Sequence, residues 1–229
     1  MIAVAMLVNR KSYSTVRQMT SVLTIARTRR EAQRSSRRDA ILDVAAQSFL
    51  VNGYAATTMS AIAAALGGSK GTLWKYFPSK ELLFAAVIER VSDTFRQELT
   101  VILNPADDID VALDRFCLEF LRKVTSPEAV AVNRLVMGET ARFPEVGRIF
   151  YESAPRLTHS LLADYIATAM ERGQLCPGDP LRAAQHLVSL CMSRGYQQLL
   201  LGIVDRVDPA MIRADVASAL DTFLRAFRP

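Results

Sequence analysis

The sequence predicts an all-α protein with a small N-terminal three-helix domain and a larger C-terminal helical domain. Apolar residues recur at spacings of three and four along most of the chain, which is the period of a helix with one buried face. No segment of useful length alternates apolar and polar residues as a half-buried strand would. Because the 229 residues exceed the usual single-domain size of roughly 100–150 residues, we expect two domains.

Residues 1–35 show no clear periodicity and carry seven arginine or lysine residues interleaved with serine and threonine. We expect a mobile tail. It is either a solvated extension, with Met19 as an alternative start of the protein, or a basic arm that contacts phosphates or a minor groove. The apolar opening MIAVAMLV precedes the positive charges, which is the reverse of their order in a secretory signal.

The first firm helix is predicted over residues 36–52, and Gly53 and Tyr54 end it. One apolar stripe gives it a buried face: Ile41, Leu42, Ala45, Phe49 and Leu50. Arg37 and Arg38 lie at its start, where positive charge opposes the helix dipole. A phosphate bound nearby would offset that cost.

Residues 57–77, TTMSAIAAALGGSKGTLWKYF, predict two short helices joined by a tight turn. Thr57 and Thr58 can cap the first helix, over about 59–66, because a hydroxyl accepts a free N–H at a helix start. Gly67 and Gly68 end it, since glycine takes the left-handed backbone of a sharp exit. Ser69 is expected to cap the second helix, which runs to residue 77. A proline at 78 forbids a long continuation.

The second short helix leaves an outward face of cations, hydroxyls and ring edges, with a glycine that allows close approach. Such a face suits insertion into a DNA major groove, where base edges carry donors and acceptors. We assign four residues chiefly to phosphates: Lys70, Lys75, Tyr76 and Lys80. We assign three to base edges: Gly71, Thr72 and Trp74. Thr58 and Ser69 complete the candidate DNA-binding set. The inward positions are Ile62, Leu66, Leu73 and Phe77.

The charge is unevenly distributed. Residues 1–98 hold 14 Lys and Arg against 7 Asp and Glu, a net +7, whereas residues 99–229 hold 14 against 16, a net −2. The basic excess therefore lies on the segment with the candidate DNA reader, as a phosphate-binding end requires. A solvated basic surface would look the same by charge alone.

Beyond the reader the pattern is helical throughout. Ser79 caps a long helix from Lys80, and the polar stretch 104–110 marks a domain boundary, which gives domains at 36–96 and 107–229. Four further helices are expected over about 110–124, 127–142, 180–203 and 209–227, with a fifth, interrupted at Pro155, ending at Gly173. Serine or aspartate followed by proline starts several of them.

Several function classes find no support. The three cysteines have no CxxC spacing, so neither a metal site nor a disulfide framework is indicated, and a reducing cytoplasm fits. No apolar run reaches the roughly 20 residues that span a bilayer, so no membrane partner is expected. The two histidines, His159 and His186, fall in no metal or triad spacing, and no nucleotide-binding or nucleophile motif occurs. We therefore expect no enzyme, no cofactor and no metal.

The stretch from Ser36 to about Arg96 closely resembles the N-terminal domain of TetR-family bacterial transcriptional regulators. The resemblance rests on RRDAILDVAAQSFLVNGYAATTM, SKGTLWKYF and FPSKELLFAAVIERV. It implies a helix-turn-helix reader, an operator DNA partner and a long helix whose tilt sets the separation of two readers in a dimer. Two departures are Gly68, where the family more often has an apolar residue, and Trp74, where it usually has tyrosine.

A looser resemblance links VNRLVMGETARFPEVGRIFYESAPR and LADYIATAMERGQL to the C-terminal domain of AefR-like regulators. It implies an effector-binding and dimerising domain without an agreed ligand class. The last two predicted helices are richer in apolar residues than one buried face requires, so they could form a four-helix dimer interface. A monomer core is the alternative.

A ligand pocket should lie among the helices spanning about 95–195, and it should be mostly apolar and take a small apolar or aromatic effector. Nine candidate lining residues fall there: Phe95, Phe116, Phe120, Met137, Glu139, Tyr151, Tyr165, His186 and Met192. Each could equally be ordinary core. Glu139 and His186 stand out, because polar groups inside apolar helices need a partner.

The sequence thus predicts a cytoplasmic, nucleoid-associated homodimer that regulates transcription, more often as a repressor than as an activator. The preference for repression over activation follows from the resemblance and not from the residues. The alternative is a helical small-molecule-binding or interaction protein that does not bind DNA. That alternative leaves the exposed cations and rings of SKGTLWKYF unexplained.

Overall fold

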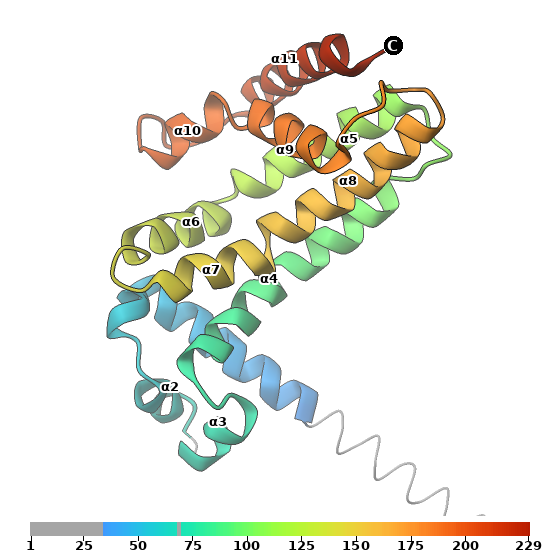
Figure 1. Cartoon of the computed structure of the whole chain (residues 1–229). Coiled ribbons are helices and arrows are strands. Elements are labelled where there is room, and N and C mark those ends of the chain that lie inside the picture. The colour runs from blue at the N-terminus through green and yellow to red at the C-terminus, as the bar shows by residue number, and fades with distance from the viewer. Residues whose placement is uncertain (1–33, 68–69) are drawn as a thin grey trace, which may run out of the picture.

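The computed structural model describes residues 34–67 and 70–229. Within these ranges the chain forms helices and no strand, so the predicted all-α class is confirmed. Figure 1 shows the helices of residues 59–76 at one end of an elongated molecule and those of residues 180–227 at the opposite end. The predicted tail, residues 1–35, lies almost wholly outside the described residues.

The first described helix covers residues 34–56. It is followed by α2 (Met59–Ala65), α3 (Lys70–Tyr76), α4 (Lys80–Ile102), α5 (Ile109–Val124), α6 (Pro127–Glu139), α7 (Pro144–Ser153), α8 (Pro155–Glu171), α9 (Pro180–Cys191), α10 (Gly195–Leu200) and α11 (Pro209–Phe227). The predicted starts hold because side chains satisfy the first free N–H groups. Ser79 caps α4, Ser126 caps α6 and Asp208 caps α11.

Two apolar clusters form the interior. The first joins the helix 34–56, α2, α3 and the start of α4, and it also takes in Val136 of α6 and Val146 of α7. The second joins the end of α4 to α5, α8, α9 and α11. The first cluster therefore crosses the predicted boundary between residues 96 and 107, and α4 contributes to both clusters.

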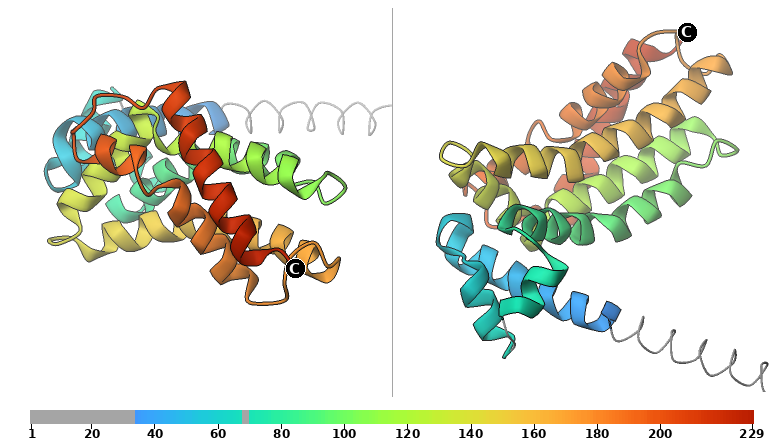
Figure 2. Two further views of the ribbon diagram at one scale, coloured as in Figure 1. Left: turned by 90° about the horizontal axis from the view of Figure 1, so that it is seen from above. Right: turned by 60° about the horizontal axis from the view of Figure 1, so that its bottom comes forward.

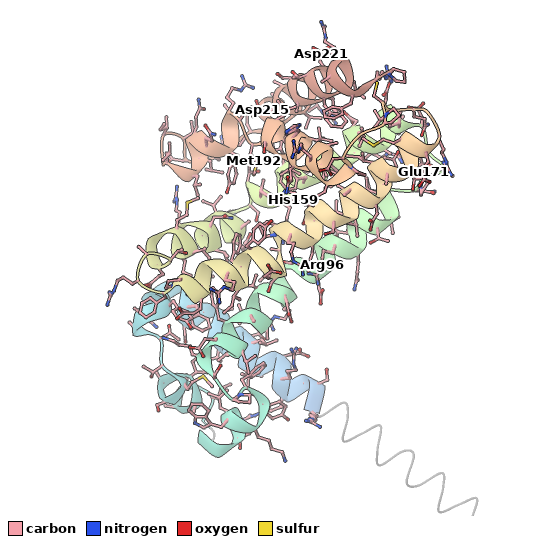
Figure 3. All side chains as sticks on the ribbon, in the orientation of Figure 1. Arg96, His159, Glu171, Met192, Asp215 and Asp221 are labelled. Atoms are coloured by element: carbon pink, nitrogen blue, oxygen red, sulfur yellow. The ribbon has the colours of Figure 1, made fainter. Side chains whose placement is uncertain are left out.

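The helix predicted over 180–203 is in fact two helices, α9 and α10. The carboxylate of Asp215 on α11 accepts a hydrogen bond from the backbone N–H of Gly195 at 3.1 Å and pairs with Arg194 Nε at 2.6 Å. This buried carboxylate fixes the corner between the two helices (Figure 3). The helix predicted to reach 142 likewise ends earlier, at Glu139.

The buried apolar residues of α11 pack within their own protomer. Ile212, Val216, Phe223 and their apolar neighbours on α11 are buried against α5 and α9 in the second cluster. The apolar richness that suggested a dimer interface is thus accounted for inside one chain. What α9 and α11 leave outward is mainly small or polar: Arg182, His186, Ala214, Ala217, Ser218 and Asp221. Figure 2 shows α11 lying across the outside of the molecule.

Among the helices within residues 34–67 and 70–229, none is both long enough and apolar enough to cross a bilayer.

Candidate DNA-binding surface and internal cavity

Two adjacent threonine side chains fix the junction between the first helix and α2. Thr58 Oγ1 accepts a hydrogen bond from the backbone N–H of Ala61 at 3.1 Å, which caps the helix as expected. The buried hydroxyl of Thr57 is directed instead at the carbonyl oxygens of Gly53 and Ser48, at 2.7 and 3.0 Å. Thr57 therefore secures the end of the preceding helix, while Thr58 alone caps α2.

The helix α3 has a buried side and an outward side. Leu73 is 2% exposed and joins the first cluster, as does Phe77 just after the helix. Gly71 and Lys75 are exposed, and Trp74 keeps 47% of its surface accessible. About half of the indole surface is therefore open to a ligand outside the protein. The outward side thus combines a cation, a large ring and a glycine, which fits the predicted reader face.

Two arginines of the first helix lie beside α3. The guanidinium of Arg34 is 6.0 Å from the ring centroid of Tyr76, and that of Arg38 is 5.5 Å from that of Phe77. Cation–π attraction therefore holds both charges next to the reader helix. Sequence reasoning placed Arg34 in the tail and assigned Arg38 no place beside α3. Their positions depend on helix packing, which no local pattern encodes.

Lys80 is directed inward rather than along the α3 face. Its ammonium donates to the backbone carbonyl oxygen of Tyr54 at 2.9 Å and lies 4.1 Å from the Tyr54 ring centroid. Thr72 and Tyr76 are half-buried. Ser69 and the side chain of Lys70 lie outside the described residues, as does Gly68. Of the predicted set, the structure thus gathers Gly71, Trp74 and Lys75 on one open face, and Lys80 is the member it separates from them.

The corner between α6 and α7 contacts the DNA-binding end. Glu139 Oε1 accepts a hydrogen bond from the backbone N–H of Ala55 at 3.1 Å. Close by, Phe143 meets the Tyr54 ring edge-to-face at 5.5 Å between centroids. Gly53 has a φ of 78°, and a Cβ there would lie 2.8 Å from Glu139 Oε1. The contact therefore needs glycine both for backbone shape and for space.

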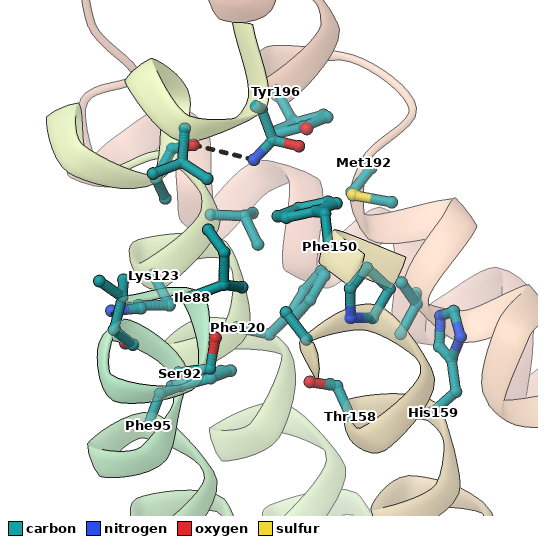
Figure 4. Close-up of a pocket in the computed structure, with 18 residues that line it drawn as sticks. Ile88, Ser92, Phe95, Phe120, Lys123, Phe150, Thr158, His159, Met192 and Tyr196 are labelled. Carbon is teal, nitrogen blue, oxygen red and sulfur yellow. Dashed lines mark hydrogen bonds between the residues drawn. The ribbon is translucent and has the colours of Figure 1, made fainter. Parts of the chain in front are cut away.

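A cavity of about 200 Å³ lies between the DNA-binding end and the second cluster. Seven helices, α4 to α10, contribute to its lining (Figure 4). On α4 it runs from Ile88, a member of the first cluster, to Phe95, a member of the second. Most of the wall is apolar: Val91, Phe120, Val124, Ala129, Val132, Phe150, Ala154, Pro155, Val188 and Met192.

The polar part of the wall is small. It consists of Ser92, Lys123, Asn133, Thr158, His159 and Tyr196. The ammonium of Lys123 donates to the Val91 carbonyl oxygen at 3.0 Å, and Asn133 Nδ2 donates to the Ala129 carbonyl oxygen at 2.9 Å. Burial raises the pKa of Tyr196 and lowers that of His159, so both side chains are neutral near pH 7.

Three of the nine predicted lining residues, Phe95, Phe120 and Met192, line this cavity, and six do not. Phe116 and Tyr165 are buried within the second cluster. The six misplaced residues differ in cause: Phe116 and Tyr165 pack in the core, Met137, Tyr151 and His186 are exposed, and Glu139 bonds to Ala55. Helix register explains most of this, because an apolar residue on a helix can face core, cavity or solvent.

Sequence reasoning missed the residues of α8 and α10 that line the cavity. The sequence pattern points to His159 only as a candidate catalytic or metal-ligating residue and does not point to Tyr196, although both line the cavity. The local signal is weak, because Thr158 and His159 stand between Arg156 and Ser160 in a stretch where polar residues are common. Buried polar residues need a partner, and by that criterion the sequence singles out His186, which is exposed.

Comparison with known proteins identifies the family. A family profile described as "AefR-like transcriptional repressor, C-terminal domain" matches residues 111–229, and one described as "Bacterial regulatory proteins, tetR family" matches residues 41–87. The HTH-type transcriptional regulator RutR of Escherichia coli K12 is 31% identical over 168 residues, which cover 67% of this chain and 69% of RutR.

Similar solved structures support the same family assignment. The flavonoid-responsive regulator FrrA is 34% identical with a TM-score of 0.73, and the alignment covers 85% of this chain and 98% of FrrA. The SmeT–triclosan complex is 25% identical with a TM-score of 0.62, and the alignment covers 84% of this chain and 91% of SmeT. TetR regulators bind operator DNA and act as dimers. The chain therefore belongs to the TetR family and is a DNA-binding transcriptional regulator, with an N-terminal helix-turn-helix and an AefR-like C-terminal domain.

Proposed function

We propose that this regulator is a cytoplasmic repressor that a small apolar or aromatic molecule releases from its operator. The observation that supports this most is the position of the cavity on α4. The stretch of α4 from Ile88 to Phe95 lines the cavity, and the same helix contributes Leu83 and Phe84 to the first cluster, which forms the core of the DNA-binding end. A molecule in the cavity therefore contacts the helix that orients the reader.

Release requires that the effector bind one conformation better than the other. In the proposed mechanism the free dimer holds both readers at operator spacing, and the effector favours a state in which α4 is tilted. The second route to the reader is the α6–α7 corner. Ala129, Val132 and Phe150 line the cavity, and Glu139 and Phe143 of the same segment contact the DNA-binding end.

The dimer is proposed to form through the outward faces of α9 and α11. These faces lie at the end of the molecule opposite α2 and α3 (Figure 1), so two protomers joined there would leave both readers free. Small side chains such as Ala214, Ala217 and Ser218 allow close helix approach. Two readers on a pseudo-palindrome would combine modest affinities into tight binding. Ala217→Arg should yield a monomer in analytical ultracentrifugation.

The chemistry of the effector is suggested by the wall and by two relatives. Rings of Phe95, Phe120 and Phe150 surround an apolar space. FrrA is described as flavonoid-responsive, and SmeT was solved with triclosan, and both of these ligands are aromatic. Aromatic compounds are therefore the first effectors to test here.

The deciding experiment measures binding of the pure protein to DNA from around its own gene, at two salt concentrations, with and without a flavonoid or triclosan. We expect sequence-selective binding that weakens steeply with salt and is released by an effector. Ala129→Phe should fill the cavity and abolish release while DNA binding remains. Ala131→Phe, on the exposed side of the same helix, is the matched control and should respond like the wild type. Release that persists in Ala129→Phe would place the effector elsewhere.

A further inference from the structure

The cavity wall carries a single charged side chain. Of the 18 described residues that line the cavity, Lys123 of α5 alone is charged near neutral pH, because burial keeps His159 neutral and no aspartate, glutamate or arginine is among them. The other lining residues are apolar or polar without charge. The cavity therefore combines a largely apolar wall with a net positive charge and no negative charge.

The ammonium of Lys123 has no carboxylate partner among the residues that the structure describes. It donates one hydrogen bond, to the Val91 carbonyl oxygen at 3.0 Å, whereas an ammonium group can donate three. Glu119 lies one turn earlier on α5, a spacing that allows an ion pair with Lys123, but it pairs with Arg122 at 2.6 Å instead. This half-buried cation thus keeps N–H groups that a ligand could use.

The hydrogen bond to Val91 places the ammonium beside a turn of α4 that forms part of the wall. Val91, Ser92 and Phe95 of that turn all line the cavity, and Figure 4 shows Lys123 on the same side as Ser92 and Phe95. Thr158 of α8 lines the cavity as well. The hydroxyls of Ser92 and Thr158 can donate hydrogen bonds, so the wall offers a cation and neutral donors together.

An anionic ligand complements this wall better than a neutral one. A neutral aromatic molecule can fill the apolar space, but it leaves the ammonium without an opposite charge. A carboxylate can accept hydrogen bonds from the ammonium, and such charge-assisted bonds are roughly twice as strong as those between neutral groups. The attraction is also stronger away from water, and no negative side chain of the wall opposes it.

We propose that the effector is an aromatic acid whose carboxylate pairs with the ammonium of Lys123 while its ring lies among the phenylalanines of the wall. Lys123 is then the residue that selects aromatic anions over neutral molecules of the same shape. The volume of about 200 Å³ suits one or two rings, since an apolar cavity of about 150 Å³ holds benzene. This inference rests on the proposed function, because it takes the cavity as the effector site.

The test compares two probes of nearly the same shape, 2-naphthoate and 2-naphthamide, by isothermal titration calorimetry on the full-length protein at pH 7. We expect the wild type to bind the carboxylate about tenfold more tightly than the amide, the equivalent of about 1.4 kcal/mol. Lys123→Met keeps a long side chain but removes the charge, so the preference should vanish while the amide binds as before. Lys123→Arg keeps the charge and should retain part of the preference.

Arg122→Met is the matched control. It removes a positive charge from the neighbouring position on α5, and Arg122 is exposed and does not line the cavity, so the preference should survive. Ala129→Phe fills the cavity and should abolish binding of both probes.

Equal binding of both probes to the wild type, a preference that Lys123→Met leaves intact, or one that Arg122→Met removes would overturn the role of Lys123 and leave the cavity standing as an aromatic site. Carboxylate binding that persists in Ala129→Phe would place the anion outside the cavity and overturn the inference as well. Failure of the wild type to bind either probe would instead overturn the cavity as an aromatic site, on which the proposed function depends.

Discussion

The candidate DNA-binding surface comes from one contiguous stretch of the chain, whereas the cavity is lined by residues scattered between Ile88 and Tyr196. The reader is set by local contacts, such as the Thr58 cap and the burial of Leu73. The cavity is set by the packing of seven helices. Local rules therefore specify the first region, and only tertiary packing specifies the second. The two regions meet where Glu139 and Phe143 contact the chain at Gly53 to Ala55, and this contact depends on both local backbone shape and tertiary packing.

The largest expected effect tests whether the two regions unfold together. Phe84 meets Phe49 and Tyr54 edge-to-face at centroid distances of 5.1 and 5.3 Å, and it is almost fully buried. Phe84→Ala should lower the free energy of unfolding by about 3–5 kcal/mol. The matched variant in the second cluster is Phe116→Ala, also fully buried.

Because Val136 and Val146 tie the C-terminal domain into the first cluster, both variants should shift one common transition in urea denaturation. Circular dichroism and the fluorescence of Trp74 should report the same midpoint. Two separate transitions, with Phe84→Ala moving only the fluorescence, would show that the DNA-binding end unfolds independently.

The joining region gives the next largest effect. Gly53→Ala forces a left-handed backbone on alanine, at about 1–2 kcal/mol, and brings a methyl group against Glu139. Gly173→Ala has a similar φ of 71° but no atom within 4 Å of the added Cβ, so it measures the backbone term alone. We expect Gly53→Ala to be the more destabilising of the two in thermal unfolding, and to weaken effector-induced release as well. Equal losses would show that Glu139 moves aside freely.

The sequence could predict those parts of the molecule that depend on neighbouring residues. The helix starts at Lys80, Pro127 and Pro209 follow from caps and prolines and agree with the structure. The break before Gly195 depends on Asp215, 20 positions away, so no local pattern could reveal it. The same reason explains why most of the predicted pocket residues were misplaced, since the residues that face a cavity are decided by packing between helices.

A smaller effect concerns the reader itself. Lys75 is exposed in the last turn of α3, and we assign it to a phosphate. Lys75→Ala should weaken binding to all DNA sequences about equally, by roughly tenfold, and reduce the slope of log affinity against log salt by about 0.9. Fluorescence anisotropy at several salt concentrations measures both. Arg115→Ala removes an exposed charge on α5, away from the outward faces of α9 and α11, and should leave the slope unchanged. A loss confined to one base position would contradict the phosphate role.

The smallest effect near neutral pH concerns Tyr54. Its hydroxyl donates to Glu81 Oε1 at a long 3.4 Å, so Tyr54→Phe should change the free energy of unfolding by less than about 1 kcal/mol at pH 7. The difference should grow in alkali. Burial, followed by the nearby carboxylates of Glu81 and Glu145, raises the pKa of Tyr54. The folded protein therefore keeps a proton that the unfolded chain releases at about pH 10.

Since the unfolded state then binds fewer protons than the folded state, the stability contributed by Tyr54 is complete below about pH 10 and falls as the pH rises further. Tyr54→Phe should flatten that fall, as measured by urea denaturation between pH 8 and 11. Tyr165 provides the comparison in the second cluster, because burial and the carboxylates of Asp107 and Asp108 raise its pKa as well. If Tyr165→Phe flattened the alkaline loss more than Tyr54→Phe, the second cluster, and not the aromatic core of the DNA-binding end, would limit stability at high pH.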